Sequence, residues 1–401
     1  MIPTLLILTD DCVSPSHGTG AALLRQLKEF PPAKLPHGYL NRKGDPFLPR
    51  SYHVDPKRNR PGSWWRGLPG QSPEVPPHPG CSTREFLDAV LSDSAPIDLV
   101  YSCVFGETGL RWLSDILDRL PPGTPAVHHA NDFLYDRQKI FENLLRKLSP
   151  RIAEFWAIGQ KLAEEVERIT GREAVLMTPF QCDIQPDWKQ AHREFGSDCK
   201  AVMLGNSHMP FVLHHLRNVW SEVGKECPGI QPIQWYAYPS SVSYVEDAGV
   251  AFGPEIEYAG FLDERTLHEQ LCSADFAIVP FNIHDEPEYH YAEFSIPSRI
   301  TEFVNAGLPI FAAAGTGTEA CRFITENEIG LCKAIADEEA FTESLLRFAH
   351  DTEGRKRMGA HNRRFSESEC DIRRYRTRLL KRFNHILGTR QTPPPAGATQ
   401  P

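Results

Sequence analysis

The sequence lacks several patterns that identify particular classes of protein. No stretch approaches the roughly 20 consecutive apolar residues that a membrane-spanning helix needs. The first residues run directly into an apolar strand pattern, without the basic leader and small-residue cleavage site of a secretory signal. Lys and Arg number 43 against 52 Asp and Glu, and this balance argues against a dedicated nucleic-acid binder. We therefore expect a cytoplasmic protein, in which any membrane contact is peripheral.

Motifs for metal, redox and dinucleotide chemistry are also missing. The ten cysteines are scattered and form no Cys-x-x-Cys, so the spacing predicts neither a zinc site nor a redox pair. Several occupy positions suited to a small apolar residue, such as Cys332, and we interpret them as buried thiols in a reducing compartment. No Gly-x-Gly-x-x-Gly follows Leu8 or Leu204 in the right register, which disfavours a dinucleotide dehydrogenase.

The sequence does contain an alternation of short apolar runs with helix-period segments, and this alternation occurs in two series. It is typical of parallel α/β layers. The first series has predicted strands at 4–9, 97–101, 126–129, 155–158 and 174–177. The second has predicted strands at 201–205, 232–237, 256–260, 275–280, 309–314 and 330–334. The predicted fold class is α/β, with two Rossmann-like doubly wound domains facing across a ligand cleft at the carboxyl ends of their strands.

Chain length and changes in composition predict the domain boundaries. A chain of 401 residues corresponds to two or three domains. We expect an N-terminal domain at 1–183 with an irregular, proline-rich insertion at about 38–80, a C-terminal domain at 197–350, helices at 351–388 and a disordered tail at 391–401. The helices at 351–388 are basic and amphipathic. We interpret them as solvent-exposed helices that lead the chain back across the first domain. The alternative is that they bind an anionic membrane surface.

The segment 294–310 has the character of a binding site, because a loop enters a helix that ends at Gly307 before a strand. Ser298 is suited to cap this helix, whose first backbone N–H groups would form an anion site. Arg299 adds N–H donors that can form two parallel hydrogen bonds with phosphate oxygens. Glu302 lies one turn beyond Ser298, where a carboxylate can accept both hydroxyls of a ribose. Taken alone, Pro-Ser-Arg is also a frequent helix start, and Glu302 could belong to a solvated helix face.

With its surroundings, this segment resembles the nucleotide-sugar-dependent glycosyltransferases of the B-type fold, which has two Rossmann domains. The similarity is greatest to the large group-one retaining family, which is family-four-like. Its motif is matched by Pro297-Ser298-Arg299, Glu302-Phe303, Ala306-Gly307 and Pro309-Ile310. The family's base-binding turn, Gly-rich loop and Gly-Leu strand resemble the segments 258–261, 315–319 and 327–331. The resemblance is strong from 201 to 349 and weak before His128.

The resemblance implies transfer of a sugar, with retention of configuration, from a nucleoside diphosphate sugar to an acceptor hydroxyl on a glycan, a lipid-linked molecule or another compound. Ser298, Arg299 and the start of their helix would hold the donor pyrophosphate, and Glu302 the donor ribose. Backbone near Phe261 would contact the base. The donor site would be completed by Gly205, Asn206, Glu293, Ser295 and Pro297. Apart from this co-substrate, no cofactor is expected, and the acidic cluster around 284–293 has no recognisable metal-ligand spacing.

In the N-terminal domain, the family places a histidine after a strand, where it touches the transferred sugar. His129 is our choice for this role and His128 its close rival, although His129 could equally be a hydrogen-bonded core histidine. If the reaction inverted configuration instead, Asp132 or His129 would be the candidate base. Gly18 and Gly20 match the family's glycine-rich loop beside donor and acceptor, or are simple turn formers.

Two departures from the family pattern bear on catalysis. Many members carry an Arg and a Lys after the first strand of the second domain, but the segment 205–210 has neither, so that Arg299, with His208, would carry more of the diphosphate charge. The family's acidic residue eight positions before Glu302 is Phe294 here, with Glu293 beside it. Two alternatives therefore stand beside the transferase: a nucleotide-sugar epimerase of the same architecture, and a non-catalytic glycosyltransferase-like subunit that binds nucleotide.

Overall fold

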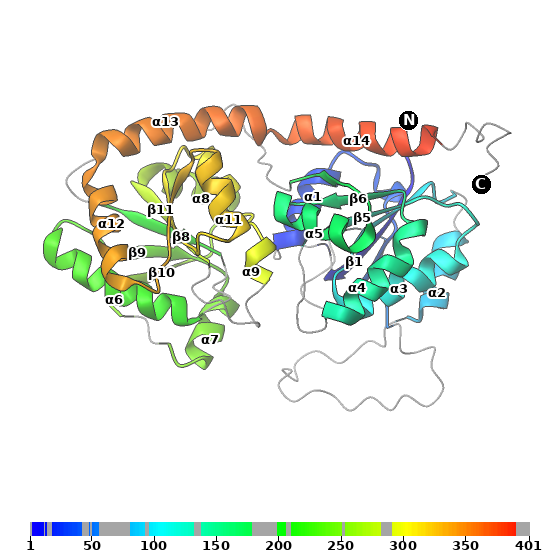
Figure 1. The fold of residues 1–401 in the computed structure, drawn as a ribbon, viewed down its shortest axis with the longest axis horizontal. Helices are drawn as coiled ribbons and strands as arrows, with labels where there is room; N and C mark the ends of the chain where they lie inside the picture. The colour runs from blue at the N-terminus through cyan, green and yellow to red at the C-terminus, as the bar shows by residue number, and fades with distance from the viewer. Residues whose placement is uncertain are drawn as a thin grey trace. The chain divides into compact units, whose positions relative to one another are not determined.

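A computed structural model describes residues 2–11, 13, 18–41, 48, 50–55, 81–92, 96–131, 138–178, 199–205, 210–250, 253–281 and 291–389. They divide into two compact units, which Figure 1 shows in ribbon form. Unit 1 contains the described residues up to Thr178 and from Arg376 onward, and unit 2 those in between. Three residues with predicted roles, Asp132, Asn206 and His208, lie outside the described residues. So do most of the 38–80 segment, the acidic residues 285–288 and the 391–401 tail.

Unit 1 is built on a seven-stranded parallel sheet in the order β3-β2-β1-β4-β5-β6-β7. Its strands are β1 (Leu5–Asp11), β2 (His37–Asn41), β3 (Ser51–His53), β4 (Leu99–Cys103), β5 (Ala126–Ala130), β6 (Glu154–Ala157) and β7 (Ala174–Leu176). Every residue of β4 and β5 is buried, as expected for central strands covered on both faces. The chain order reverses between β1 and β4. This is the switch point at which ligands bind in open α/β sheets.

The helices of unit 1 are α1 (Gly18–Leu27), η1 (Pro32–Lys34), α2 (Thr83–Leu91), α3 (Gly106–Arg119), α4 (Gln138–Leu148), η4 (Ser149–Arg151), α5 (Gln160–Thr170) and, from Arg376 onward, α14 (Ile372–Gly388). Two expectations for this unit are corrected. The segment predicted as an irregular insertion contains β2 and β3, because strands this short give little apolar periodicity in a sequence. The first helix begins at Gly18, within the segment that the family resemblance assigned to a glycine-rich loop. Gly18 and Gly20 thus lie in its first turn and not in the preceding loop.

Unit 2 is built on a six-stranded parallel sheet in the order β10-β9-β8-β11-β12-β13. Its strands are β8 (Ala201–Leu204), β9 (Ile233–Tyr236), β10 (Ile256–Gly260), β11 (Phe276–Pro280), β12 (Ile310–Ala313) and β13 (Gly330–Lys333). The chain order reverses between β8 and β11, which is the switch point of this sheet. The predicted fold class, α/β with two doubly wound parallel sheets, is confirmed.

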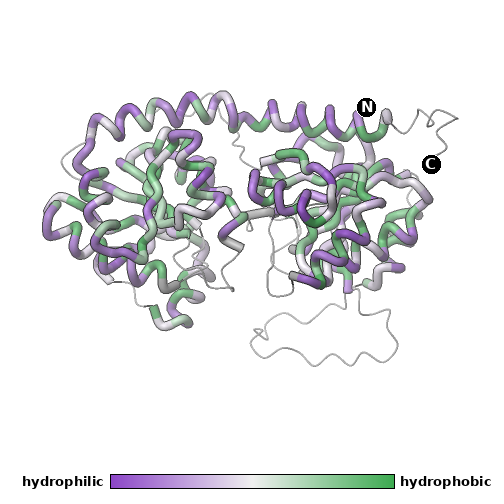
Figure 2. The backbone as a smooth tube through the Cα atoms, viewed as in Figure 1, coloured by the Kyte–Doolittle hydropathy of each residue, from purple (hydrophilic) through white to green (hydrophobic). Residues whose placement is uncertain are grey.

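Helices cover both faces of the second sheet. They are α6 (Pro210–Glu226), α7 (Pro239–Asp247), α8 (Glu264–Ser273), α9 (Tyr291–Phe294), α10 (Ile300–Asn305), α11 (Glu319–Glu326), α12 (Glu338–His350) and α13 (Thr352–Glu369). Residues of α6, α7 and α12 pack with Met203 on one face, whereas residues of α8, α10 and α11 pack with Leu204 on the other. Successive residues of a strand point to opposite faces, so each strand contributes to both cores. Figure 2 shows the strands as largely hydrophobic and α13 as mostly hydrophilic.

The part of α14 that belongs to unit 1 is held by a buried aromatic cluster. Phe383 is fully buried, stacks on Trp156 with ring centroids 5.4 Å apart and meets Tyr101 edge-on at 5.6 Å. Polar contacts surround this cluster: Arg376 pairs with Glu29 at 2.6 Å, and Arg382 pairs with Glu154 at 2.7 Å. Aromatic packing and partly buried ion pairs thus join the C-terminal helix to the first sheet.

Three histidines are buried in the core of unit 1. His37 bonds Thr9 and Ser51, at 2.8 and 3.0 Å, and His128 lies 3.4 Å from the Ser102 hydroxyl. Burial lowers the pKa of His37 and His129 from 6.5 to about 3, and that of His128 to about 4. All three are therefore neutral in the folded protein at pH 7, and each becomes easier to protonate when the chain unfolds.

We predict that Phe383→Ala lowers the free energy of unfolding of unit 1 by about 3–5 kcal/mol, because it leaves a cavity against Trp156 and Tyr101. Urea denaturation followed by circular dichroism measures this change. Asn384→Ala, an exposed neighbour on the same helix, should change stability by less than about 0.5 kcal/mol. Equal stability of the two variants would contradict the packing of α14 on this sheet.

We also predict that unit 1 loses stability as the pH falls from 7.5 to 5.0. Because the folded pKa values of the three histidines lie below their unfolded value of 6.5, their contribution is complete above pH 6.5 and declines below it. The expected loss is about 2 kcal/mol for each histidine over this interval. Urea midpoints at the two pH values measure it. His37→Gln should weaken the pH dependence, whereas replacement of the exposed His385 by Gln should leave it unchanged; a flat profile in the unmutated protein would refute the assignment.

Candidate functional site

The carboxyl end of β8, at the switch point of the second sheet, is where two predicted site residues meet. Gly205 follows the strand with φ +75°, and its N–H donates to the Tyr236 carbonyl at 2.8 Å. Arg299 donates from Nη1 to the Leu204 carbonyl. A Cβ atom at Gly205 would lie 3.2 Å from Cζ of Arg299. The guanidinium therefore lies directly against the backbone of Gly205, and a glycine is needed both for this conformation and for the close approach.

The segment that carries Arg299 is anchored in the core of unit 2. Ile296 and Ile300 are buried in the same hydrophobic cluster as Leu204. Ser295 and Pro297, both predicted site residues, are buried as well. This packing fixes the backbone on both sides of Ser298 and Arg299, whose side chains are half-buried. Residues on so rigid a support hold their positions without a ligand.

The start of α10 differs from the prediction. Its N-cap is Arg299, without a side-chain capping bond, and the helix runs only from Ile300 to Asn305. The Pro297 and Ser298 carbonyls accept from the N–H groups of Ile300 and Thr301, each at 3.1 Å. Ser298 is thus not the cap, because the chain is already turning at Pro297. A helix of six residues has a weak dipole, so that charge at this position comes mainly from Arg299.

Glu302 and Glu293 lie on either side of this turn. Glu302 is in the first turn of α10 and is half-buried. Glu293 belongs to the short helix α9 and is also half-buried. Glu302 is on the helix that Arg299 caps, and Glu293 is on the helix before it, six residues from Arg299 in the chain. The segment therefore presents a cation and carboxylates together, a combination suited to a phosphate next to sugar hydroxyls.

An aromatic pair lies at the carboxyl ends of β9, which is next to β8, and of β10, which is next to β9. Tyr238 follows β9 and Phe261 follows β10; their rings stack with centroids 4.1 Å apart and an interplanar angle of 21°. Phe261 is 55% exposed, which is unusual for a large hydrophobic side chain and leaves ring surface open to solvent. Tyr238 was not among the residues predicted from the sequence. Its position directly after a buried strand was the available signal.

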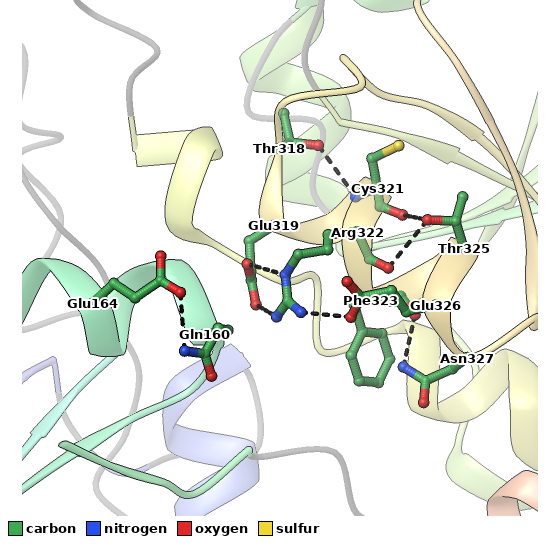
Figure 3. Close-up of polar contacts among 10 residues, drawn as sticks. All are labelled: Gln160, Glu164, Thr318, Glu319, Cys321, Arg322, Phe323, Thr325, Glu326 and Asn327. Atoms are coloured by element: carbon green, nitrogen blue, oxygen red, sulfur yellow. Dashed lines mark hydrogen bonds and ion pairs between the residues drawn. The ribbon is translucent and has the colours of Figure 1, made fainter. Parts of the chain in front are cut away.

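The loop after β12 leads into α11, and Figure 3 shows its polar contacts. The Thr318 hydroxyl donates to the Gly315 carbonyl at 2.8 Å and accepts from the N–H of Cys321 at 3.2 Å, so Thr318 caps the helix. Glu319 is fully buried and forms an ion pair with Arg322, which also reaches Glu326 at 2.5 Å. These contacts fix the Gly-rich loop at the carboxyl edge of the same sheet.

In unit 1, His129 is a core histidine, the other interpretation that its sequence position left open. It is 2% exposed; Nε2 lies 3.0 Å from the Met177 carbonyl and Nδ1 lies 2.8 Å from the Tyr101 hydroxyl. A carbonyl only accepts, so Nε2 carries the proton and Tyr101 donates to Nδ1. With both ring nitrogens bonded and the pKa near 3, His129 is a poor sugar contact or base. The reason is that β5 continues through His129 to Ala130.

The residue that follows β5 is Asn131, which was also not among the residues predicted from the sequence. Asn131 is half-buried, and its side chain is hydrogen-bonded to the Cys103 thiol at the end of β4. Asp10, at the end of β1, is 6% exposed and accepts from the N–H of Phe105 at 2.5 Å. Burial raises the pKa of Cys103 to about 12, so this thiol stays protonated. Asp10, Cys103 and Asn131 thus gather at the carboxyl ends of the three central strands.

Neither a metal centre nor a membrane span is found in the described part of the chain. Among those residues, no three or more His, Cys, Asp or Glu side chains are grouped so that they could hold a metal ion. None of the described helices combines the length and the apolar character needed to cross a bilayer.

Known proteins are similar to this chain in fold but not in sequence. No protein-family model and no curated protein matches the chain. Among solved structures, sucrose-phosphate synthase from Thermosynechococcus elongatus is 12% identical with a TM-score of 0.65, over 96% of this chain and 100% of that one. HepE from Anabaena, in complex with UDP-glucose, is 12% identical with a TM-score of 0.62, over 95% and 99%. Trehalose 6-phosphate synthase from Burkholderia multivorans is 10% identical with a TM-score of 0.58, over 98% of each chain.

These similarities extend over nearly the whole of each chain, although few residues are identical. At such identities they establish the architecture alone. The resemblance noted in the sequence is confirmed at this level: the chain has the B-type glycosyltransferase fold, made of two Rossmann-like parallel sheets.

Proposed function

We propose that the protein is a glycosyltransferase that moves a sugar from a nucleoside diphosphate sugar to an acceptor hydroxyl, with retention of configuration as the family resemblance implies. The observation that carries this proposal is the position of Arg299 against Gly205 at the switch point of the second sheet. The similar HepE structure, which holds UDP-glucose, supports the same class of donor.

Arg299 and Ser298 bind the donor pyrophosphate in this proposal. Breaking the bond between the sugar and the diphosphate leaves negative charge on the departing phosphate, and a fixed guanidinium stabilises that charge more than it stabilises the intact donor. The contact with the Leu204 carbonyl orients the guanidinium before the donor arrives. The expected contribution of His208 stays a prediction, since that residue is outside the described part.

The remaining donor contacts follow from neighbouring elements. Glu302, in the first turn of α10, accepts the ribose hydroxyls, and Glu293 lies beside the transferred sugar. The open surface of the Tyr238–Phe261 pair stacks on the base, while backbone at Phe261 contacts its polar edge. Strand order supports this direction, because β9 and β10 extend from β8 away from β11.

Unit 1 is proposed to bind the acceptor at its own carboxyl edge. Asn131 takes the position after the strand at which the family has a histidine, and its amide can both donate to and accept from a hydroxyl. Gly18 and Gly20, in the first turn of α1, are the glycines that the family resemblance places beside donor and acceptor. His129 has no part in this assignment.

A non-catalytic nucleotide-binding subunit is the second candidate, favoured by the absence of Arg and Lys from segment 205–210. Both candidates predict binding of a nucleoside diphosphate, but only the transferase cleaves the donor. Calorimetric titration with UDP, GDP and ADP and with their hexose conjugates, followed by assays of donor hydrolysis on any ligand that binds, separates the two. Binding with slow hydrolysis supports the transferase; binding without turnover, with any acceptor, supports the subunit.

Replacing Arg299 by Ala is expected to raise the Kd for the nucleoside diphosphate about 10- to 100-fold, the cost of one charge-assisted contact with phosphate. Isothermal titration calorimetry measures it, with the unfolding midpoint as a check that the variant folds. Arg265→Ala is the matched control, because Arg265 is 73% exposed on α8 of the same unit. The site is refuted if a folded Arg299→Ala protein binds as tightly as the control.

Loss of the aromatic pair is expected to weaken nucleotide binding but not pyrophosphate binding. Tyr238→Ala and Phe261→Ala should each raise the Kd for the nucleoside diphosphate roughly 5- to 100-fold, the range of base–aromatic stacking. The affinity for inorganic pyrophosphate, measured by its competition with the nucleoside diphosphate, should be unchanged. Tyr244→Ala, which removes an exposed tyrosine from α7, serves as the control. If both variants bind the nucleotide as tightly as the unmutated protein, the base does not stack on the Tyr238–Phe261 pair.

A further inference from the structure

Two cysteines that are 11 positions apart in the chain meet in unit 2. Cys321 lies in the first turn of α11 and Cys332 in the neighbouring strand β13. The Cys332 sulfur lies 3.9 Å from the Cys321 carbonyl oxygen, and the two thiols are hydrogen-bonded to each other. The sequence contains no Cys-x-x-Cys, and its cysteine spacing therefore predicted no redox pair. The turn from α11 into β13 produces the pairing instead.

The two thiols differ in their access to solvent and in their acidity. Cys321 is 5% exposed, whereas Cys332 is half-buried and follows Leu331, which is 44% exposed. The hydrogen bond from Cys332 lowers the pKa of Cys321 and raises that of Cys332, while burial raises the pKa of Cys103 and Cys199 to about 12. Since the thiolate is the nucleophile, Cys321 is the more reactive of these thiols at neutral pH.

We propose that Cys321 and Cys332 form a reversible disulfide when the protein meets a peroxide. The Cys321 thiolate attacks one peroxide oxygen; a sulfur–oxygen bond forms, the oxygen–oxygen bond breaks and hydroxide leaves, taking a proton to become water. The Cys332 sulfur then attacks the Cys321 sulfur, and the hydroxyl leaves as a second water. Two thiols and one hydrogen peroxide thus yield one disulfide and two waters.

The disulfide would act on the loop that precedes α11. The N–H of Cys321 donates to the Thr318 hydroxyl, and that hydroxyl donates in turn to the Gly315 carbonyl. The Cys321 carbonyl also accepts from the Thr325 hydroxyl at 2.8 Å, as Figure 3 shows. A covalent link from Cys321 to β13 therefore restrains the segment 315–318 through its helix cap. This proposal does not depend on the proposed function, because every contact in it lies between α11, its loop and β13.

Peptide mapping of the full-length protein tests the proposal. The fully reduced protein is treated with a small molar excess of hydrogen peroxide, alkylated, digested without reductant and analysed by mass spectrometry. We expect a peptide linked between Cys321 and Cys332 that dithiothreitol removes. Amide hydrogen exchange in segment 315–320 should be slower in the oxidised protein. Peroxide treatment that yields no such peptide overturns the disulfide, and a linked protein with unchanged exchange overturns the restraint of the loop.

Single-cysteine variants test the order of the steps. Cys332→Ser removes the second sulfur, so Cys321 should stop at the sulfenic acid, which dimedone traps. Cys321→Ser should give little dimedone adduct at Cys332 under the same treatment. Cys272→Ser, which removes a buried cysteine from α8, should still form the 321–332 link. Equal dimedone labelling of the two single variants would contradict Cys321 as the attacking thiol.

Discussion

The contact between the Arg299 guanidinium and the backbone at Gly205 is the constraint on which the site of unit 2 depends. It joins the carboxyl end of β8 to the start of α10, two elements that are separated by about half of the unit in sequence. Trp235 strengthens this junction, because its indole N–H donates to the Gly205 carbonyl at 2.9 Å. A side chain at position 205 would have to adopt a positive φ and push the guanidinium away by a few tenths of an ångström. The strand end, the arginine and the glycine thus require one another.

The chemistry proposed for this site follows from that junction. A diphosphate leaving group needs positive charge that is already in place, since moving a flexible cation at the moment of bond breaking costs free energy. Here the buried residues Ile296 and Ile300 fix the backbone around Arg299, and the Leu204 carbonyl orients its side chain. A group-transfer site needs a rigid backbone and a cation that is already oriented. The hydrophobic core of the second unit holds both in place.

The sequence was a good guide to the fold and to the segment 294–310, and a poorer one to single residues. Apolar runs identify buried parallel strands because both faces are covered. However, they do not show where a strand ends, and only two positions separate His129, inside β5, from Asn131, just beyond it. Ser298 has the chemistry of a helix cap, but the chain already turns at Pro297. The Tyr238–Phe261 stack and the Cys321–Cys332 pair depend on strand order and on a helix-to-strand turn, which local spacing does not encode.

The central claim, that unit 2 binds a nucleoside diphosphate at the carboxyl edge of its sheet, is tested most directly by amide hydrogen exchange with and without each of UDP, GDP and ADP. The account predicts that the nucleotide that binds slows exchange at 203–205, 237–239, 260–262 and 297–302, while the opposite, amino-terminal edge of the same sheet is unaffected. Protection confined to other segments, or none with any of the three nucleotides at millimolar concentration, would contradict it.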